Sequence, residues 1–136
     1  PVIYYGSEWG MTGASDPDNR RMMKFEDSLD RYQLELLETT RKIINIRKNS
    51  TALKYGDLIP VLVEHDVFAY LRTDFNEKYL VVLNKSESNK EITVSFPDYL
   101  NIIAGNDLIS NVNYKIINNT INLNLSKKGF AILKLN

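Results

Sequence analysis

After Gly56 the sequence becomes a series of short segments rich in β-branched and aromatic residues, and no other feature constrains the fold as much. Turn-forming residues separate the segments, for example Asn118-Asn119 and residues 126–129. Seven or eight short strands at this spacing are typical of an antiparallel β-sandwich or barrel. We therefore predict a mainly β fold, with strands over residues 58–64, 67–72, 78–83, 92–96, 114–117, 121–125 and 130–135.

The first 56 residues have a different pattern. Residues 2–5 are β-branched and aromatic without polar alternation, which predicts a strand buried on both faces. A long loop follows over residues 6–24, because Gly, Ser, Asp, Pro and Asn dominate it. Apolar residues then recur at helical spacing over residues 29–48, with Asp27 or Ser28 as the expected N-cap. We predict one βα unit over residues 1–56 and a β domain over residues 57–136.

Composition excludes several classes of function. Lys plus Arg and Asp plus Glu each number 17, so the net charge is zero and no overall field favours nucleic acid or an anionic membrane. No apolar run is long enough to span a membrane. The chain has no cysteine and a single histidine, His65, and the Asp16-x-Asp18-x-Arg20 spacing fails as a calcium loop. We expect no metal site and no cofactor.

The opening sequence "PVIYYGSEWGMTGASDPDNRRMM" carries a family resemblance. It resembles the segment around the eighth barrel strand of the α-amylase family of glycoside hydrolases (family 13). The match is closest to the cyclomaltodextrinase, neopullulanase and maltogenic amylase branch, whose pattern is similar to P-x-I-Y-Y-G-x-E-x-G-M-x-G-x-x-D-P-x-N/C-R-R-P-M-x-W. The resemblance implies that residues 1–56 are the last strand, loop and helix of a truncated (β/α)8 barrel, followed by the C-terminal β-sandwich.

Two residues depart from the family pattern. Met22 stands where proline is usual, which leaves the loop backbone freer. Phe25 stands where tryptophan is usual, which keeps an aromatic face but loses an indole donor. Neither change removes a charged group, so charged residues of the loop can still contact substrate as the resemblance implies.

The resemblance also assigns roles in the loop. Asp16 and Arg20 match positions that hydrogen-bond sugar near the cleavage point, although the residues alone also fit an Asx turn closed by a local ion pair. Trp9 either stacks on a sugar or packs beneath the loop. Glu8 and Tyr5 are expected to support the end of the strand rather than to touch substrate. No catalytic residue is assigned within the chain.

The resemblance implies a retaining hydrolase that cleaves α-1,4 or α-1,6 glucosidic bonds in maltodextrins, cyclodextrins or pullulan. Its catalytic carboxylates come from barrel strands four, five and seven, so we expect these 136 residues to be inactive alone. The alternative is a non-catalytic β module with a structural or carbohydrate-binding role. Residues 1–48 are expected to order by packing on the β domain or by self-association, and the resembled branch indicates a cytoplasmic rather than a secreted protein.

Overall fold

A computed structural model describes all residues from Pro1 to Asn136, and the chain divides into two compact units. Unit 1 comprises Pro1–Ile46 and unit 2 comprises Arg47–Asn136. No helix combines the length and the apolar character needed to cross a membrane.

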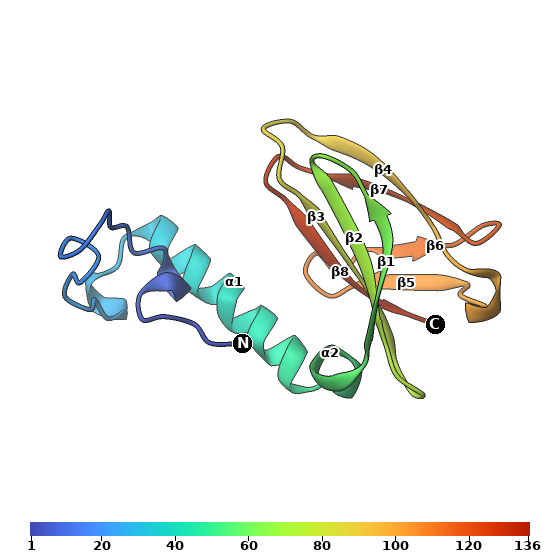
Figure 1. Cartoon of the computed structure of the whole chain (residues 1–136), viewed down its shortest axis with the longest axis horizontal. Coiled ribbons are helices and arrows are strands. Elements are labelled where there is room, and N and C mark those ends of the chain that lie inside the picture. The colour runs from blue at the N-terminus through green and yellow to red at the C-terminus, as the bar shows by residue number, and fades with distance from the viewer. The chain divides into compact units, whose positions relative to one another are not determined.

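Unit 1 contains two short 3-10 helices, η1 (Ser7–Trp9) and η2 (Glu26–Ser28), and most of the long helix α1 (Arg31–Lys48) (Figure 1). The helix begins two residues later than predicted because Asp30, rather than Asp27 or Ser28, provides its cap. The Asp30 carboxylate accepts from the Gln33 amide at 3.0 Å, and the Gln33 side chain accepts from the Asp30 amide at 3.1 Å. This reciprocal pair is a capping box.

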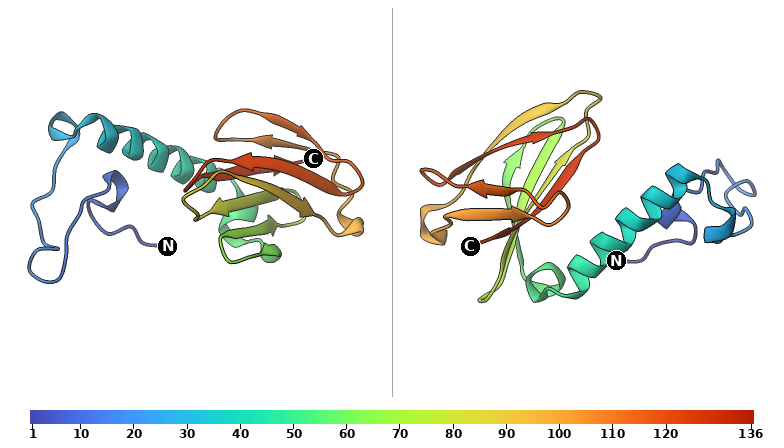
Figure 2. Two further views of the ribbon diagram at one scale, coloured as in Figure 1. Left: turned by 90° about the horizontal axis from the view of Figure 1, so that it is seen from above. Right: turned by 180° about the vertical axis from the view of Figure 1, so that it is seen from behind.

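The predicted strand over residues 2–5 is wrong for this structure. These residues form no ladder, and Val2 and Tyr4 are exposed. The views in Figure 2 show the same N-terminal segment without a strand. A strand is defined by hydrogen bonds to a neighbour, so a strand-like composition cannot produce one where unit 1 offers no other strand.

Unit 2 begins with the last two residues of α1, Arg47 and Lys48, and continues with the short helix α2 (Thr51–Tyr55), which the sequence did not predict. Eight strands follow: β1 (Asp57–Val63), β2 (Val67–Thr73), β3 (Lys78–Asn84), β4 (Lys90–Ser95), β5 (Ala104–Asp107), β6 (Asn113–Lys115), β7 (Thr120–Leu125) and β8 (Phe130–Leu135). A 3-10 helix, η3 (Asp98–Leu100), lies between β4 and β5. Of these strands, β5 was not predicted.

The strands form two sheets that are antiparallel throughout. The larger has the order β1-β2-β3-β8-β5-β6, and the smaller pairs β4 with β7. Asn118 and Asn119 have positive φ values of 51° and 55° in the two-residue turn before β7, as expected for asparagine in a tight hairpin. The predicted mainly β, antiparallel fold is confirmed.

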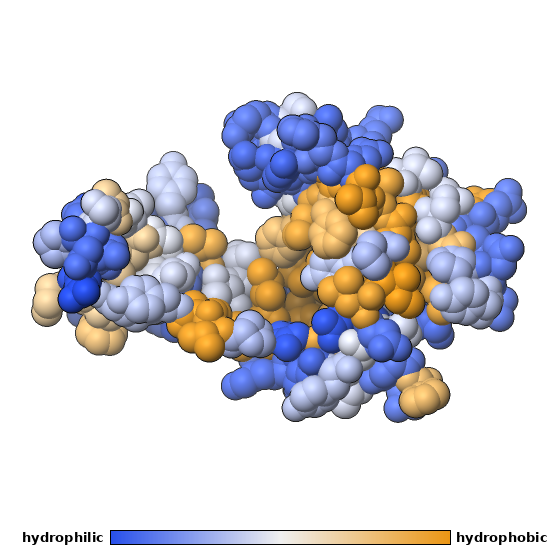
Figure 3. All heavy atoms as spheres, in the orientation of Figure 1, coloured by the Kyte–Doolittle hydropathy of each residue, from blue (hydrophilic) through white to orange (hydrophobic).

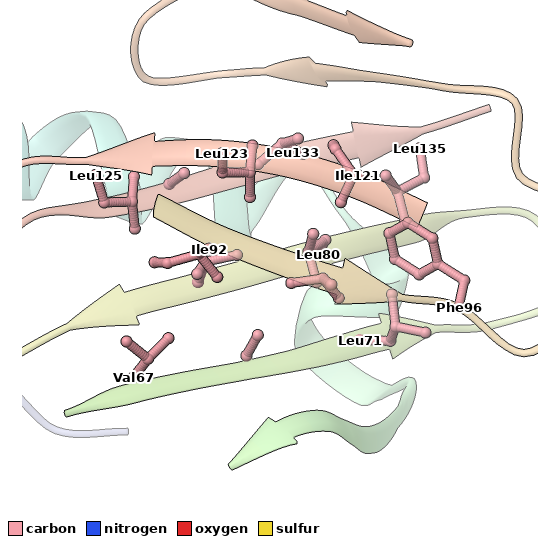
Figure 4. Packing of buried hydrophobic residues seen from close by; sticks show 14 of the residues in the cluster. Val67, Leu71, Leu80, Ile92, Phe96, Ile121, Leu123, Leu125, Leu133 and Leu135 are labelled. Atoms are coloured by element: carbon pink, nitrogen blue, oxygen red, sulfur yellow. The ribbon is translucent and has the colours of Figure 1, made fainter. Parts of the chain in front are cut away.

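The core lies between the inward faces of the two sheets (Figure 4). In β2, alternate residues point into it: Val67, Ala69 and Leu71 are buried and the residues between them are half-buried. The largest side chains that are fully buried include Leu71, Leu80, Ile121 and Leu133. This apolar layer is what holds unit 2 together.

Apolar side chains also remain on the outside of unit 2. Figure 3 shows orange side chains gathered on the visible face over β1 and β2. Leu58 and Val63 of the edge strand β1 are exposed, and so is Leu83 of β3. Contiguous apolar surface of this kind is characteristic of faces that contact other protein.

Candidate functional site

The candidate site is the loop between η1 and η2 in unit 1, and both of its ends are fixed to α1. At the first end, the Thr40 hydroxyl donates to the Glu8 carbonyl at 3.0 Å. At the second end, the Arg41 guanidinium pairs with Glu26 of η2 and, at 2.7 Å, with Glu38. Adjacent residues of one helix therefore hold the two ends of the loop, as in the compact surface loops that often carry function.

Two glycines with positive φ flank the short helix η1: Gly6 at 83° precedes it and Gly10 at 80° follows it. A Cβ at Gly10 would lie 2.9 Å from the Leu36 Cδ2 atom of α1. The left-handed backbone favours glycine there, whereas the Leu36 methyl is the end of a flexible side chain and could move aside. The tight turn directs the chain from η1 into the loop.

Asp16 and Arg20, the two predicted sugar contacts, lie together on the loop surface. The Arg20 Nε atom is 2.7 Å from the Asp16 Oδ1 atom, and the side chains are 70% and 59% exposed, respectively. The local ion pair that the residues alone suggested is therefore present. Its exposure also leaves both groups accessible to a ligand, so a sugar contact stays a prediction.

A second ion pair in the loop was missed by the sequence analysis. The Arg21 Nε and Nη2 atoms donate to the Asp18 carboxylate at distances between 2.8 and 3.1 Å. The Ala14 amide donates to the other side of the same carboxylate at 2.8 Å. This hydrogen bond, followed by those from Arg21, lowers the pKa of Asp18 below its usual value. The only signal in the sequence was a second acidic residue before tandem arginines.

The remaining predicted residues lie at the base of the loop. Trp9 is only 4% exposed, so its ring packs inside unit 1, and stacking on a sugar stays a prediction that requires the ring to be uncovered. The Trp9 Nε1 and Glu8 Oε2 atoms are buried without a hydrogen-bond partner. The Tyr5 hydroxyl donates to the Arg21 carbonyl at 3.2 Å, and its desolvation raises the pKa of Tyr5.

The aromatic residues of unit 2 form no continuous exposed platform. Tyr79 and Phe96 are buried, whereas Tyr70, Tyr114 and Phe130 are half-buried. Tyr55, Phe75 and Tyr99 are exposed, but Tyr55 lies in α2, Phe75 follows β2 and Tyr99 lies in η3. No three metal-ligating side chains come together anywhere in the chain.

Residues 61–132 match the family model described as "Maltogenic Amylase, C-terminal domain", which covers more than half of the chain. The chain therefore belongs to the family of maltogenic amylase C-terminal domains, within the α-amylase group of glycoside hydrolases.

Individual relatives agree with this assignment. The chain is 31% identical to a maltogenic alpha-amylase of Bacillus acidopullulyticus, over 98% of this chain and 23% of the relative. It is 36% identical to a cyclomaltodextrinase of Geobacillus thermopakistaniensis, over 68% of this chain and 16% of the relative. The chain thus spans less than a quarter of the length of either relative.

A solved structure shows the same fold. The α-amylase of Geobacillus thermoleovorans, crystallised with acarbose, superposes with a TM-score of 0.83 at 23% identity. The match covers 100% of this chain and 29% of the α-amylase chain. The resemblance seen in the opening sequence is confirmed at the level of the family.

Proposed function

We propose that this chain is the C-terminal portion of a retaining α-glucan hydrolase that cleaves α-1,4 or α-1,6 glucosidic bonds in maltodextrins, cyclodextrins or pullulan. The match of residues 61–132 to the maltogenic amylase C-terminal domain is the observation that carries the proposal. The named relatives, a maltogenic alpha-amylase and a cyclomaltodextrinase, support the class of substrate. In this proposal residues 1–56 are the last βα unit of the catalytic barrel.

Two structural features support the idea that more protein packs on this chain. Buried polar groups in proteins are nearly always hydrogen-bonded, yet the Glu8 Oε2 and Trp9 Nε1 atoms have no partner. Apolar side chains also gather on the face over β1 and β2, where Leu58 and Val63 are exposed, and contiguous apolar surface is characteristic of faces that contact other protein. Other parts of the enzyme would provide the missing donor, the missing acceptor and the apolar cover.

Within this enzyme, Asp16 and Arg20 would contact sugar hydroxyls. A carboxylate accepts hydrogen bonds from hydroxyls and a guanidinium donates to them, so the exposed pair can orient a sugar ring. The unit 2 sandwich would have a structural role, which its buried and scattered aromatic residues support over the alternative of a carbohydrate-binding module. The chain alone would be inactive, because the nucleophile and the proton donor would come from other strands.

The experiment compares the full-length gene product with residues 1–136, using cyclodextrin, pullulan and maltooligosaccharides as substrates. We expect reducing sugar from the full-length protein and none above the blank from the 136 residues. Activity of the 136 residues alone, or no hydrolysis of any of these glucans by the full-length protein, would refute the proposal. Shifted amide resonances over residues 57–136 on adding maltoheptaose would instead favour the carbohydrate-binding module.

A further inference from the structure

Asp18 and Arg21 form a connected group of hydrogen bonds that the proposed sugar contact does not use. The Asp18 Oδ1 atom accepts from Arg21 Nε at 3.1 Å and from Arg21 Nη2 at 2.8 Å. The Asp18 Oδ2 atom accepts from the Ala14 amide at 2.8 Å and from Arg21 Nη2 at 2.9 Å. Both oxygens of the carboxylate are therefore engaged within the loop itself.

The same arginine reaches two further points of the chain. Its Nη1 atom donates to the Thr12 hydroxyl at 3.3 Å, and its backbone carbonyl accepts from the Tyr5 hydroxyl at 3.2 Å. Arg21 thus joins the segment before η1 and both arms of the loop. We call the group formed by Tyr5, Thr12, Ala14, Asp18 and Arg21 the loop brace.

The two arms that the brace joins are in close contact. A Cβ added to Gly13 would lie 2.8 Å from the Asn19 Cα atom and 3.1 Å from the Asp18 carbonyl oxygen. Only a residue without a side chain fits between the arms at that separation. The loop is therefore closed by its own backbone packing as well as by the Asp18–Arg21 pair.

The two ion pairs of the loop differ in what they leave available. Arg20 meets Asp16 through its Nε atom, and both side chains are largely exposed, so the guanidinium retains further N–H donors for a ligand. Asp18, by contrast, makes all of its contacts to the loop. Because Asp16 and Arg20 lie on either side of Asp18 in the sequence, the brace sets the backbone from which both project.

We propose that Asp18 and Arg21 are positioning residues that hold Asp16 and Arg20 in the geometry needed to contact the sugar. The inference rests on the proposed function for its substrate. It assigns separate tasks to the tandem arginines: Arg20 meets the ligand and Arg21 maintains the loop.

The brace itself is tested by NMR on the 136-residue chain, without any sugar. The Ala14 amide proton should report the titration of the Asp18 carboxylate, with a midpoint below the usual value for aspartate of about 3.9. Asp18→Asn should abolish this titration and Asp16→Asn should leave it unchanged. An Ala14 resonance that does not titrate in the wild-type chain would overturn the brace.

The positioning role is tested in the full-length enzyme by a double-mutant cycle on maltotriose hydrolysis. We expect Asp16→Asn and Asp18→Asn each to lower kcat/KM by between about 10- and 100-fold, because a small misplacement of a positioning group has effects of this size. The double variant should be no worse than Asp16→Asn, since both changes remove the same contact. Asp57→Asn, the same replacement on an exposed strand residue of unit 2, should change neither the titration of the Ala14 amide nor kcat/KM.

The outcomes separate the two hypotheses. Multiplicative losses in the double variant, or wild-type kcat/KM for Asp18→Asn, would overturn the positioning role even if Asp16 contacts sugar. Wild-type kcat/KM for Asp16→Asn would overturn the sugar contact, and the positioning role with it. In that case the Ala14 titration would still show whether the brace exists.

Discussion

Replacing Ser50 with alanine should destabilise unit 2 far more than an ordinary serine substitution. Ser50 is only 1% exposed and is the N-cap of α2, where its hydroxyl oxygen accepts from the Leu53 amide at 3.1 Å. The same hydroxyl donates to the Glu77 Oε2 atom at 2.7 Å. Loss of an N-cap costs about 1 kcal/mol and loss of a hydrogen bond to a charged group costs about 1.5–3 kcal/mol. Because one group makes both contacts, we expect a combined loss of about 2–3 kcal/mol.

The size of this loss should depend on pH. The hydrogen bond from Ser50 is the largest cause of the lowered pKa of Glu77, and Tyr79 and Lys134 lower it further. Since the folded pKa lies below the unfolded value of about 4.3, the stabilisation is present above that pH and is lost as pH falls through the folded pKa. The difference between wild type and Ser50→Ala should therefore narrow in acid, leaving the contribution of the N-cap.

The assay is urea unfolding of the 136-residue chain followed by circular dichroism, from pH 7 down to about pH 2.5. Ser95→Ala, on an exposed position of β4, is the matched control and should lie within about 0.5 kcal/mol of wild type. A cycle with Glu77→Gln should show coupling of about 1 kcal/mol or more with Ser50→Ala at pH 7. Additive effects, or a loss for Ser50→Ala that stays constant across the pH range, would refute the reasoning.

Two further substitutions test the packing of unit 2 in the same assay. Leu133→Ala removes a fully buried side chain between the sheets and should cost about 2–5 kcal/mol, whereas Ile117→Ala on an exposed turn should cost little; equal effects would contradict the described core. Gly56 has φ −66°, so alanine is conformationally allowed and would ordinarily stabilise, but its Cβ would lie 2.5 Å from the Thr73 carbonyl oxygen. Gly56→Ala should therefore destabilise by about 1–3 kcal/mol, and a gain in stability would contradict this close approach.

Most of the strands could be predicted because β-branched and aromatic residues fill them and turn-forming residues separate them. The strand β8 was predicted with its bounds unchanged, and β2 and β3 each extend one residue beyond the prediction. By contrast, β5 has the sequence Ala-Gly-Asn-Asp, which carries no strand signal. It becomes a strand because β8 and β6 pair with it on either side, and because Gly105 admits the side chains of Leu133 and Leu135. That information lies in the tertiary structure.

The errors in the first half of the chain have physical causes of the same kind. The predicted helix end at Asn49-Ser50 was correct for α1, but Ser50 is also the N-cap of α2. A serine at the end of one helix and a serine at the start of the next cannot be distinguished from the sequence. Residues 2–5 have the composition of a strand without a partner in unit 1. The division into domains at residue 56 stays a prediction. The boundary between the two compact units lies between Ile46 and Arg47 in the chain.

In the candidate site, the sequence motif identified some of the proposed functional residues, and the others were identified only from the three-dimensional structure. The resemblance identified Asp16 and Arg20, because the family pattern names those positions. It gave no role to Asp18 and Arg21, which pair with each other. Their pairing depends on the turn, which brings the Ala14 amide to the Asp18 carboxylate and the Thr12 hydroxyl to the Arg21 guanidinium. In an irregular loop, spacing alone does not tell which acid meets which base. A sequence motif can therefore mark the residues that meet a ligand without identifying those that keep them in place, and isosteric substitutions such as Asp→Asn within the motif are needed to separate the two groups.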